Sequence, residues 1–207
     1  MIRAYSFSAA GGHAVNEDSF LVQQAPNNPE AWLVAIADGQ GGQPGGAAAS
    51  RVACLSVAAF GQLESWPDRL SQCDAAVAAV PEAGFTTLAA FEVVKNTISG
   101  ASCGDSAVVA ISKDSAPRVL TSHQFKNPPV GSGEAIFIPF EMELALPWKV
   151  LAVTDGVWKY AGWERVWDLS ARLSGDELLA ELQSAARLKT SGEFQDDFTV
   201  VLLESDE

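Results

Sequence analysis

The chain has 207 residues, 48% of them hydrophobic and 19% charged, which excludes a wholly disordered or fibrous protein. This length suits one substantial domain, and we expect residues 1–207 to form it. Thirteen Lys and Arg residues against 26 Asp and Glu residues give a net charge of −13, with no basic run. The charge therefore argues against a nucleic-acid or anionic-membrane partner, and it leaves a surplus of carboxylates to explain.

Short segments rich in Val, Ile, Phe and Thr, bounded by Gly, Pro, Asn or Asp, predict β-strands. In chain order they are 2–9, 19–24, 32–38, 86–94, 106–112, 118–121, 135–140, 149–155 and 198–204. Lys95 and Asn96 predict a hairpin turn. The strands and helices come in blocks rather than in strict alternation, which favours an α+β fold with antiparallel sheets and flanking helices.

Helices are predicted over 47–63, 67–80, 163–169 and 176–188, the last preceded by a capping Ser174. Residues spaced three or four apart give the first and last of these helices an apolar face each. The faces are formed by Val52, Leu55, Ala59 and Leu63 in the first and by Leu178, Leu179, Leu182 and Ala186 in the last. We expect both faces to be buried.

Cys54, Cys73 and Cys103 have no CxxC spacing, so we expect free or buried thiols in a reducing compartment. No signal-peptide core is visible near the N-terminus. No apolar run approaches the ~20 residues that span a bilayer. A soluble, cytoplasmic monomer is therefore expected.

Acidic residues stand at the ends of several predicted strands, next to Gly or Asn. They are Glu17 and Asp18, Asp38, Asp155, and Asp196 and Asp197. A single Asp-Gly pair is typical of a turn, but four such clusters indicate a site for a hard divalent cation such as Mg²⁺ or Mn²⁺. With only His13 and His123 available, a nitrogen-rich zinc site is disfavoured.

Six short motifs occur in one order along the chain. They are Asn16-Glu17-Asp18, Ala37-Asp38-Gly39-Gln40-Gly41-Gly42, Gly84-Phe85-Thr86-Thr87, Gly104-Asp105-Ser106, Thr154-Asp155-Gly156-Val157-Trp158 and Asp196-Asp197-Phe198-Thr199-Val200. Together they resemble the metal-dependent protein phosphatase family (protein phosphatase 2C-like), in the size of its compact bacterial members, over residues 8–204. Each motif is weak alone, and the order of all six carries the resemblance.

The resemblance implies a four-layer α/β/β/α sandwich with two central antiparallel β-sheets flanked by helices. It also implies a protein serine/threonine phosphatase that hydrolyses phosphoserine and phosphothreonine by attack of a water activated between two Mg²⁺ or Mn²⁺ ions. The partner would be a phosphorylated protein, and whether a protein kinase opposes the enzyme stays open.

By the same resemblance, Asp38 would bridge two divalent cations and the carbonyl of Gly39 would complete one ion's shell. Asp155 and Asp196 would bind the other ion. These carboxylates carry −3 against +4 from the ions, so the centre would be locally positive in an acidic protein.

Further residues take supporting roles in this comparison. Glu17 and Asp18 would hold metal-bound waters. Asp197, which stands where many relatives have Asn, would lie in the second shell around the ions. Thr87 and Asp105 would be structural or second-shell.

The chain departs from the family pattern at two positions. Many relatives have a phosphate-binding Arg where this chain has His13, whose imidazole lacks the two-pronged guanidinium. His13 could contact phosphate, act as a proton donor or be a surface residue, and these alternatives stay open. Gln40 stands where some relatives have a suggested general acid, and it cannot serve as one. Because residues 105–155 form a short span without the larger relatives' flap, substrate recognition near 126–133 is also open.

Other functions are less well supported. Ser102 lies in a G-x-S-x-G pattern, but a strand rather than a helix is predicted after it, and His123 is the only later histidine. The glycines of 39–46 lack the Gly-Lys-Ser/Thr ending of a P-loop. The runner-up is a catalytically weak or inactive phosphatase-like binding module in a signalling pathway, which predicts missing ligands although Asp38, Asp155 and Asp196 are present.

Overall fold

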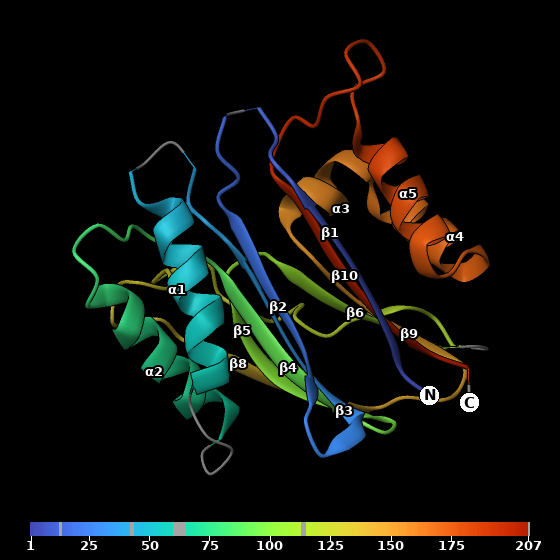
Figure 1. Cartoon of the computed structure of the whole chain (residues 1–207), viewed down its shortest axis with the longest axis horizontal. Helices are drawn as coiled ribbons and strands as arrows, with labels where there is room; N and C mark the ends of the chain where they lie inside the picture. The colour runs from blue at the N-terminus through green and yellow to red at the C-terminus, as the bar shows by residue number, and fades with distance from the viewer. Residues whose placement is uncertain (13, 42–43, 60–64, 113–114, 207) are drawn as a thin grey trace.

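A computed structural model describes residues 1–12, 14–41, 44–59, 65–112 and 115–206 (Figure 1). The strands are β1 (Arg3–Ala9), β2 (Asp18–Ala25), β3 (Asn28–Asp38), β4 (Leu88–Val94), β5 (Thr97–Cys103), β6 (Ala107–Ser112), β7 (Arg118–Val119), β8 (Ile138–Glu143), β9 (Trp148–Val153) and β10 (Phe198–Ser205). The helices are α1 (Gly46–Ala59), α2 (Trp66–Ala78), α3 (Asp155–Ala161), α4 (Trp163–Arg172) and α5 (Gly175–Ala186).

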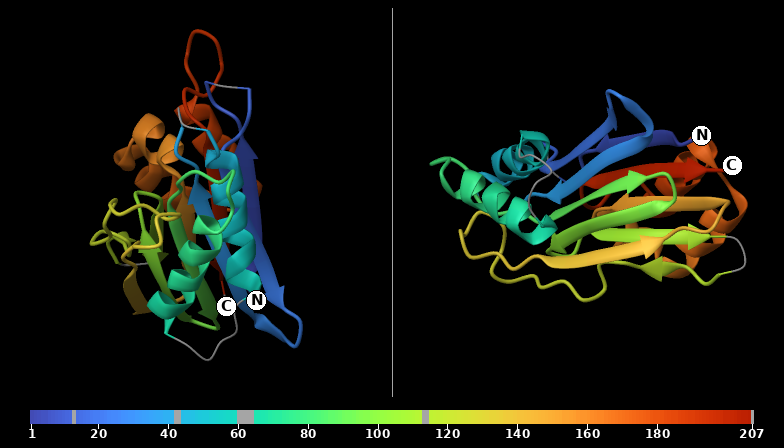
Figure 2. Two further views of the ribbon diagram at one scale, coloured as in Figure 1. Left: turned by 90° about the vertical axis from the view of Figure 1, so that its left-hand side faces the viewer. Right: turned by 90° about the horizontal axis from the view of Figure 1, so that it is seen from below.

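The strands form two antiparallel sheets that pack face to face. Sheet A has the order β1-β10-β9-β6-β7, and sheet B has the order β2-β3-β4-β5-β8. Helices α1 and α2 cover the outer face of sheet B, and α3, α4 and α5 cover that of sheet A (Figures 1 and 2). The predicted α+β sandwich of four layers is confirmed.

The alternation of side chains along β3 explains why sheet B is covered on both sides. Val34 and Ile36 point into the cluster between the two sheets, whereas Ala35 and Ala37 point toward α1 and α2. Successive residues of a strand face opposite sides, so an uninterrupted apolar strand needs a partner on each face.

Helix α5 buries the face that its sequence predicts. Leu178, Leu179, Leu182 and Ala186 all lie in the cluster between sheet A and its helices. Ser174 occupies the N-cap position, although its side chain makes no capping hydrogen bond.

The predicted apolar face of α1 is wrong. Leu55 is 58% exposed, whereas Ala49, Ala53 and Val57 are buried against sheet B. The sheet surface below α1 includes small side chains such as Ala35, and the helix packs on it through Ala49, Ala53 and Val57, while Val52 of the predicted face is partly buried at the edge of this contact. Leu63 of the predicted face lies outside the described residues.

Three further elements differ from the sequence-based predictions. Strand β5 (Thr97–Cys103) and helix α3 (Asp155–Ala161) were not predicted, and 155 begins a helix instead of ending a strand. Strand β8 begins at Ile138, three residues later than the predicted strand. Strand β5 lies in the middle of sheet B between β4 and β8, and the predicted turn at Lys95 and Asn96 joins it to β4.

The three cysteines are buried free thiols, as predicted. Burial raises the pKa of the Cys103 thiol to about 11, which keeps it protonated near neutral pH. Within the described residues, no helix is both long and apolar enough to cross a membrane.

Candidate metal centre

Two carboxylates face each other where β2 begins and β3 ends. Asp18 and Asp38 are paired directly across these antiparallel strands. Like charges in such a position repel each other, so the pairing disfavours the sheet unless a proton or a cation neutralises it. The fold therefore places two like charges next to each other at this site, which is unfavourable unless they are neutralised.

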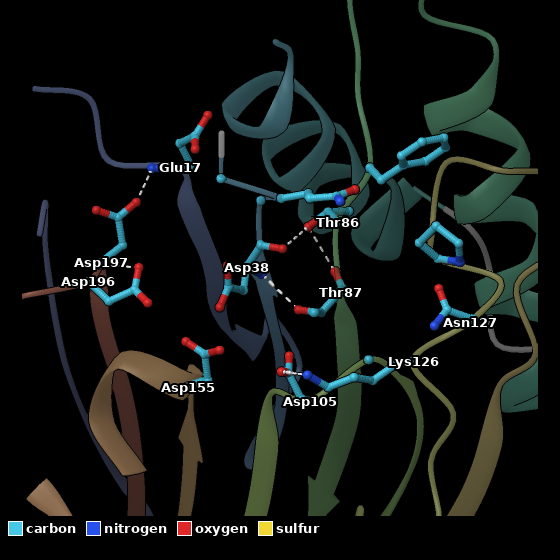
Figure 3. A pocket seen from close by; sticks show the side chains of 16 residues that line it. Glu17, Asp38, Thr86, Thr87, Asp105, Lys126, Asn127, Asp155, Asp196 and Asp197 are labelled. Carbon is cyan, nitrogen blue, oxygen red and sulfur yellow. Dashed lines mark hydrogen bonds and ion pairs between the residues drawn. The ribbon is translucent and has the colours of Figure 1, made fainter. Parts of the chain in front are cut away.

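Sheet A brings further carboxylates to the same end of the sandwich (Figure 3). Asp155 follows β9 and opens α3, and Asp196 and Asp197 directly precede β10. One carboxylate oxygen each from Asp38, Asp105 and Asp155 lies within 4.8 Å of the other two. Five segments that are distant in sequence thus supply acidic groups to a single pocket of about 420 Å³.

The buried carboxylate of Asp18 is only partly satisfied. Its Oδ2 accepts a hydrogen bond from Thr154 Oγ1 at 2.8 Å, but its buried Oδ1 has no hydrogen-bond partner. Burial is the main reason that the pKa of Asp18 rises to about 7, because the charged form loses its hydration. An unpartnered carboxylate oxygen in this position is open to a water or a cation.

Asp38 is held by its backbone while its carboxylate stays in the cluster. Its carbonyl accepts hydrogen bonds from Thr86 Oγ1 at 2.8 Å and from Thr87 N at 2.9 Å. Its own N–H donates to Thr87 Oγ1 at 2.9 Å. Burial first, and then the negative charges of Asp18 and Asp155, raise the pKa of Asp38 to about 9.

The loop that carries Glu17 is anchored by Asp197. The Asp197 carboxylate accepts hydrogen bonds from Gly11 N at 2.7 Å and from Glu17 N at 2.5 Å. Gly39 N in turn donates to the Glu17 carbonyl at 3.1 Å. A Cβ at Gly39 would stand 2.5 Å from backbone atoms of Gly46, so only glycine allows this close approach.

Two lysines neutralise part of the negative charge. Lys159 forms an ion pair with Asp155, and Lys126 forms one with Asp105. The pKa of Asp155 is nevertheless raised, because burial outweighs the hydrogen bond from Lys159. Two ammonium groups do not balance the carboxylates of the pocket.

Most of the predicted site residues come together. Glu17, Asp38, Gly39, Asp155, Asp196 and Asp197 all line the pocket. Asp18 is adjacent through its pairing with Asp38, and His13 lies outside the described residues. Asp105, expected in a supporting role, has its carboxylate in the closest acidic trio. Its position before a strand and next to Gly104 is the signal that marked the other acidic residues.

The donor set fits a hard divalent cation. The converging groups are carboxylates, and Asp18 Oδ1 is buried without a partner. Oxygen-only sites of this kind are typical of Mg²⁺ and Mn²⁺, whereas zinc sites favour His and Cys. A bound cation would offset the burial and the charge repulsion that together raise the pKa of Asp38.

The arrangement of two antiparallel sheets between two layers of helices, with acidic residues at one end, is that of the metal-dependent protein phosphatases. Residues 28–206 match the model of the family described as Stage II sporulation protein E (SpoIIE), and the chain belongs to that family. No curated protein matches the chain.

Solved structures share the fold over their whole length. A bacterial serine phosphatase superimposes with a TM-score of 0.82 at 17% identity, covering 100% of this chain and 98% of that one. RsbX in complex with magnesium superimposes with a TM-score of 0.78 at 15% identity, covering 98% of this chain and 94% of that one. The Mycobacterium tuberculosis serine/threonine phosphatase PstP/Ppp superimposes with a TM-score of 0.79 at 20% identity, covering 100% of this chain and 99% of that one. At these identities the likeness establishes the fold.

Proposed function

We propose that this chain is a Mg²⁺- or Mn²⁺-dependent phosphatase that hydrolyses phosphoserine and phosphothreonine in a protein substrate. The observation that carries the proposal is the trio Asp38, Asp105 and Asp155, whose carboxylate oxygens lie within 4.8 Å of one another in an open pocket. Without a cation, this concentration of negative charge would repel a phosphate. With one, the same pocket would attract it.

Asp38, Asp155, Asp196 and the carbonyl of Gly39 would hold two divalent cations, in line with the family's pattern. Bound there, the cations would supply a nucleophile from water at neutral pH and positive charge for the phosphoryl oxygens. Asp105 lies close enough to Asp38 and Asp155 to share in this binding.

The remaining acidic groups would act through water and through the backbone. Glu17 and Asp18 would accept hydrogen bonds from metal-bound waters, and the free Oδ1 of Asp18 suits that role. Asp197 would position Glu17 through the hydrogen bond from Glu17 N. Residues outside the ion shell commonly change metal affinity or activity 10–100-fold when removed.

The names of structural relatives, among them a bacterial serine phosphatase and a serine/threonine phosphatase, support a protein substrate rather than a small phosphomonoester. We further propose that residues 1–207 act as one monomeric domain in a signalling pathway, where a protein kinase would oppose it. The buried free thiols support a reducing, cytoplasmic setting.

Hydrolysis of p-nitrophenyl phosphate with Mn²⁺, with and without a chelator, tests the proposal. We expect turnover that the chelator abolishes and that Asp38→Ala reduces at least ~100-fold, the loss typical of a group acting on transition-state charge. Asp176→Ala, an exposed residue on α5, is the matched control and should retain wild-type turnover. If wild type and Asp38→Ala show equally little metal-dependent turnover, the alternative, a phosphatase-like binding module, replaces this proposal.

A further inference from the structure

The pocket is rich in carboxylates and poor in cations. Its described lining contains six acidic residues, Glu17, Asp38, Asp105, Asp155, Asp196 and Asp197, and one cationic side chain, Lys126. None of the described lining residues is an arginine. A phosphomonoester carries about −1.5 to −2 at pH 7, so a positive side chain in the lining would add to the attraction that bound metal ions exert on it.

Lys126 has an exposed side chain on a stretch of backbone that is held by hydrogen bonds on both sides. Its side chain is 63% exposed. The residue before it is held because Phe125 O accepts a hydrogen bond from Gly104 N at 2.7 Å. Further along, Val130 and Thr86 exchange two backbone hydrogen bonds, of 2.9 and 3.1 Å. The backbone of this segment is therefore fixed beside the pocket, and the exposed side chain of Lys126 has room to change partner.

Its present partner belongs to the acidic trio. Lys126 Nζ forms an ion pair with Asp105 Oδ2, and Figure 3 shows the side chain extending toward Asp105. A divalent cation bound among Asp38, Asp105 and Asp155 would take over the neutralisation of Asp105. Because exposed ion pairs are weak, the ammonium group would then be available to another anion.

We propose that Lys126 binds the substrate phosphate and leaves Asp105 for it when a divalent cation occupies the acidic trio. This assignment rests on the proposed function, since it concerns the substrate of that same site. Lys126 would bind phosphate at the rim of the pocket through its charge and hydrogen bonds, and it would take no part in proton transfer.

The other lysine near the site is less suited to this role. Lys159 lies one helical turn after Asp155 on α3, and its ammonium group sits 5.8 Å from the centroid of the Trp158 ring. It is not among the described residues that line the pocket. Lys159 is therefore placed to neutralise Asp155 rather than to bind a phosphate in the pocket.

Titration of inorganic phosphate into Mn²⁺-loaded protein by calorimetry tests the inference without turnover. We expect Lys126→Met to weaken phosphate binding about tenfold, as loss of one charge-assisted hydrogen bond predicts, and Lys126→Arg to restore most of it. Lys95→Met, at the β4–β5 turn near the far end of β3 from Asp38, is the matched control and should bind phosphate as wild type does.

Steady-state kinetics with a phosphoserine peptide provide the second measurement. We expect Lys126→Met to raise KM about tenfold while kcat changes less than threefold. A residue that only balanced Asp105 would alter the melting temperature of the metal-free protein and leave KM and phosphate affinity unchanged, and that result overturns the inference.

The two proposals fail in different ways. Wild-type protein without Mn²⁺-dependent turnover contradicts the proposed function, and the phosphate titration still decides the role of Lys126. Equal phosphate affinity in wild type and Lys126→Met, or no binding by either, overturns the inference about Lys126 whatever the turnover.

Discussion

Asp74 on helix α2 fastens the loop that forms one wall of the pocket. The carboxylate is 2% exposed and accepts hydrogen bonds from three backbone N–H groups. Its Oδ1 accepts from Gly131 at 2.6 Å and Gly133 at 3.2 Å, and its Oδ2 accepts from Ala135 at 3.0 Å. The loop held in this way includes Pro129, which lines the pocket.

The cost of removing this carboxylate follows from its three bonds. A hydrogen bond to a charged group contributes about 1.5–3 kcal/mol. Because the loop is partly exposed, water replaces some of that loss, and we expect Asp74→Ala to lower the free energy of unfolding by about 3 kcal/mol. Asp74→Asn keeps one acceptor but turns an amide toward the N–H of Ala135, so about 1–2 kcal/mol is expected.

Urea unfolding and thermal melting measure this effect. At about 2–4 °C per kcal/mol for a domain of this size, Asp74→Ala should melt about 6–12 °C lower than wild type. The same variant should raise KM more than it changes the affinity for Mn²⁺, since the loop wall moves while the acidic trio stays in place. A destabilisation under about 1 kcal/mol, or an Asn variant as costly as the Ala variant, would refute the reasoning.

Three other predictions concern the acidic end of the sandwich. The pKa of Asp38 rises from 3.8 to about 9 in the folded, metal-free protein, so the folded state holds a proton that the unfolded chain releases. The melting temperature in chelator should therefore fall from pH 5 to pH 9. Mn²⁺ should reduce this fall in melting temperature. A flat or rising profile in chelator contradicts this. Asp197→Asn keeps one of the two side-chain oxygens that accept backbone hydrogen bonds and should reduce Mn²⁺ affinity less than tenfold, whereas Asp197→Ala should reduce it more, with titration calorimetry as the check. A Cβ at Gly156 would lie 1.9 Å from the Asp197 carbonyl, so Gly156→Ala should lose about 3 kcal/mol or more in urea unfolding, and wild-type stability would show that the contact relaxes freely.

The layers of the fold were predictable where hydrophobic periodicity is strong. Strand β3 has apolar residues on both faces, and α5 has a clear stripe at helical spacing. Strand β5 was not predicted because Ser99, Gly100 and Ser102 give no β-branched or alternating apolar pattern. Its glycine is needed because a Cβ at Gly100 would lie 2.3 Å from the Ala90 carbonyl and 2.8 Å from the Phe140 ring.

The face of α1 could not be read from the size of its side chains. The sequence ranks Leu55 as more apolar than Ala49 and Ala53, yet the two alanines are buried against the sheet and Leu55 is exposed. This is tertiary packing overriding local hydrophobicity, and it depends on which residues β3 and β4 present beneath the helix.

The acidic residues at strand ends were predictable because β-sheet geometry brings such ends together. Asp38 and Asp155 follow this rule, and Asp105 follows it as well, although its proximity to them was not inferred. Asp74 carries no comparable signal, since it is one acidic residue within a helix. Its role depends on the fold placing Gly131 above α2.

Anomalous diffraction from crystals grown with Mn²⁺ tests the central claim, that the acidic end of the sandwich is a divalent-cation site. The account predicts anomalous peaks within ligand distance, about 2.0–2.2 Å, of carboxylate oxygens from Asp38 and Asp155, and their loss in Asp38→Asn crystals. Crystals of folded wild-type protein with millimolar Mn²⁺ and no peak at these carboxylates would contradict it.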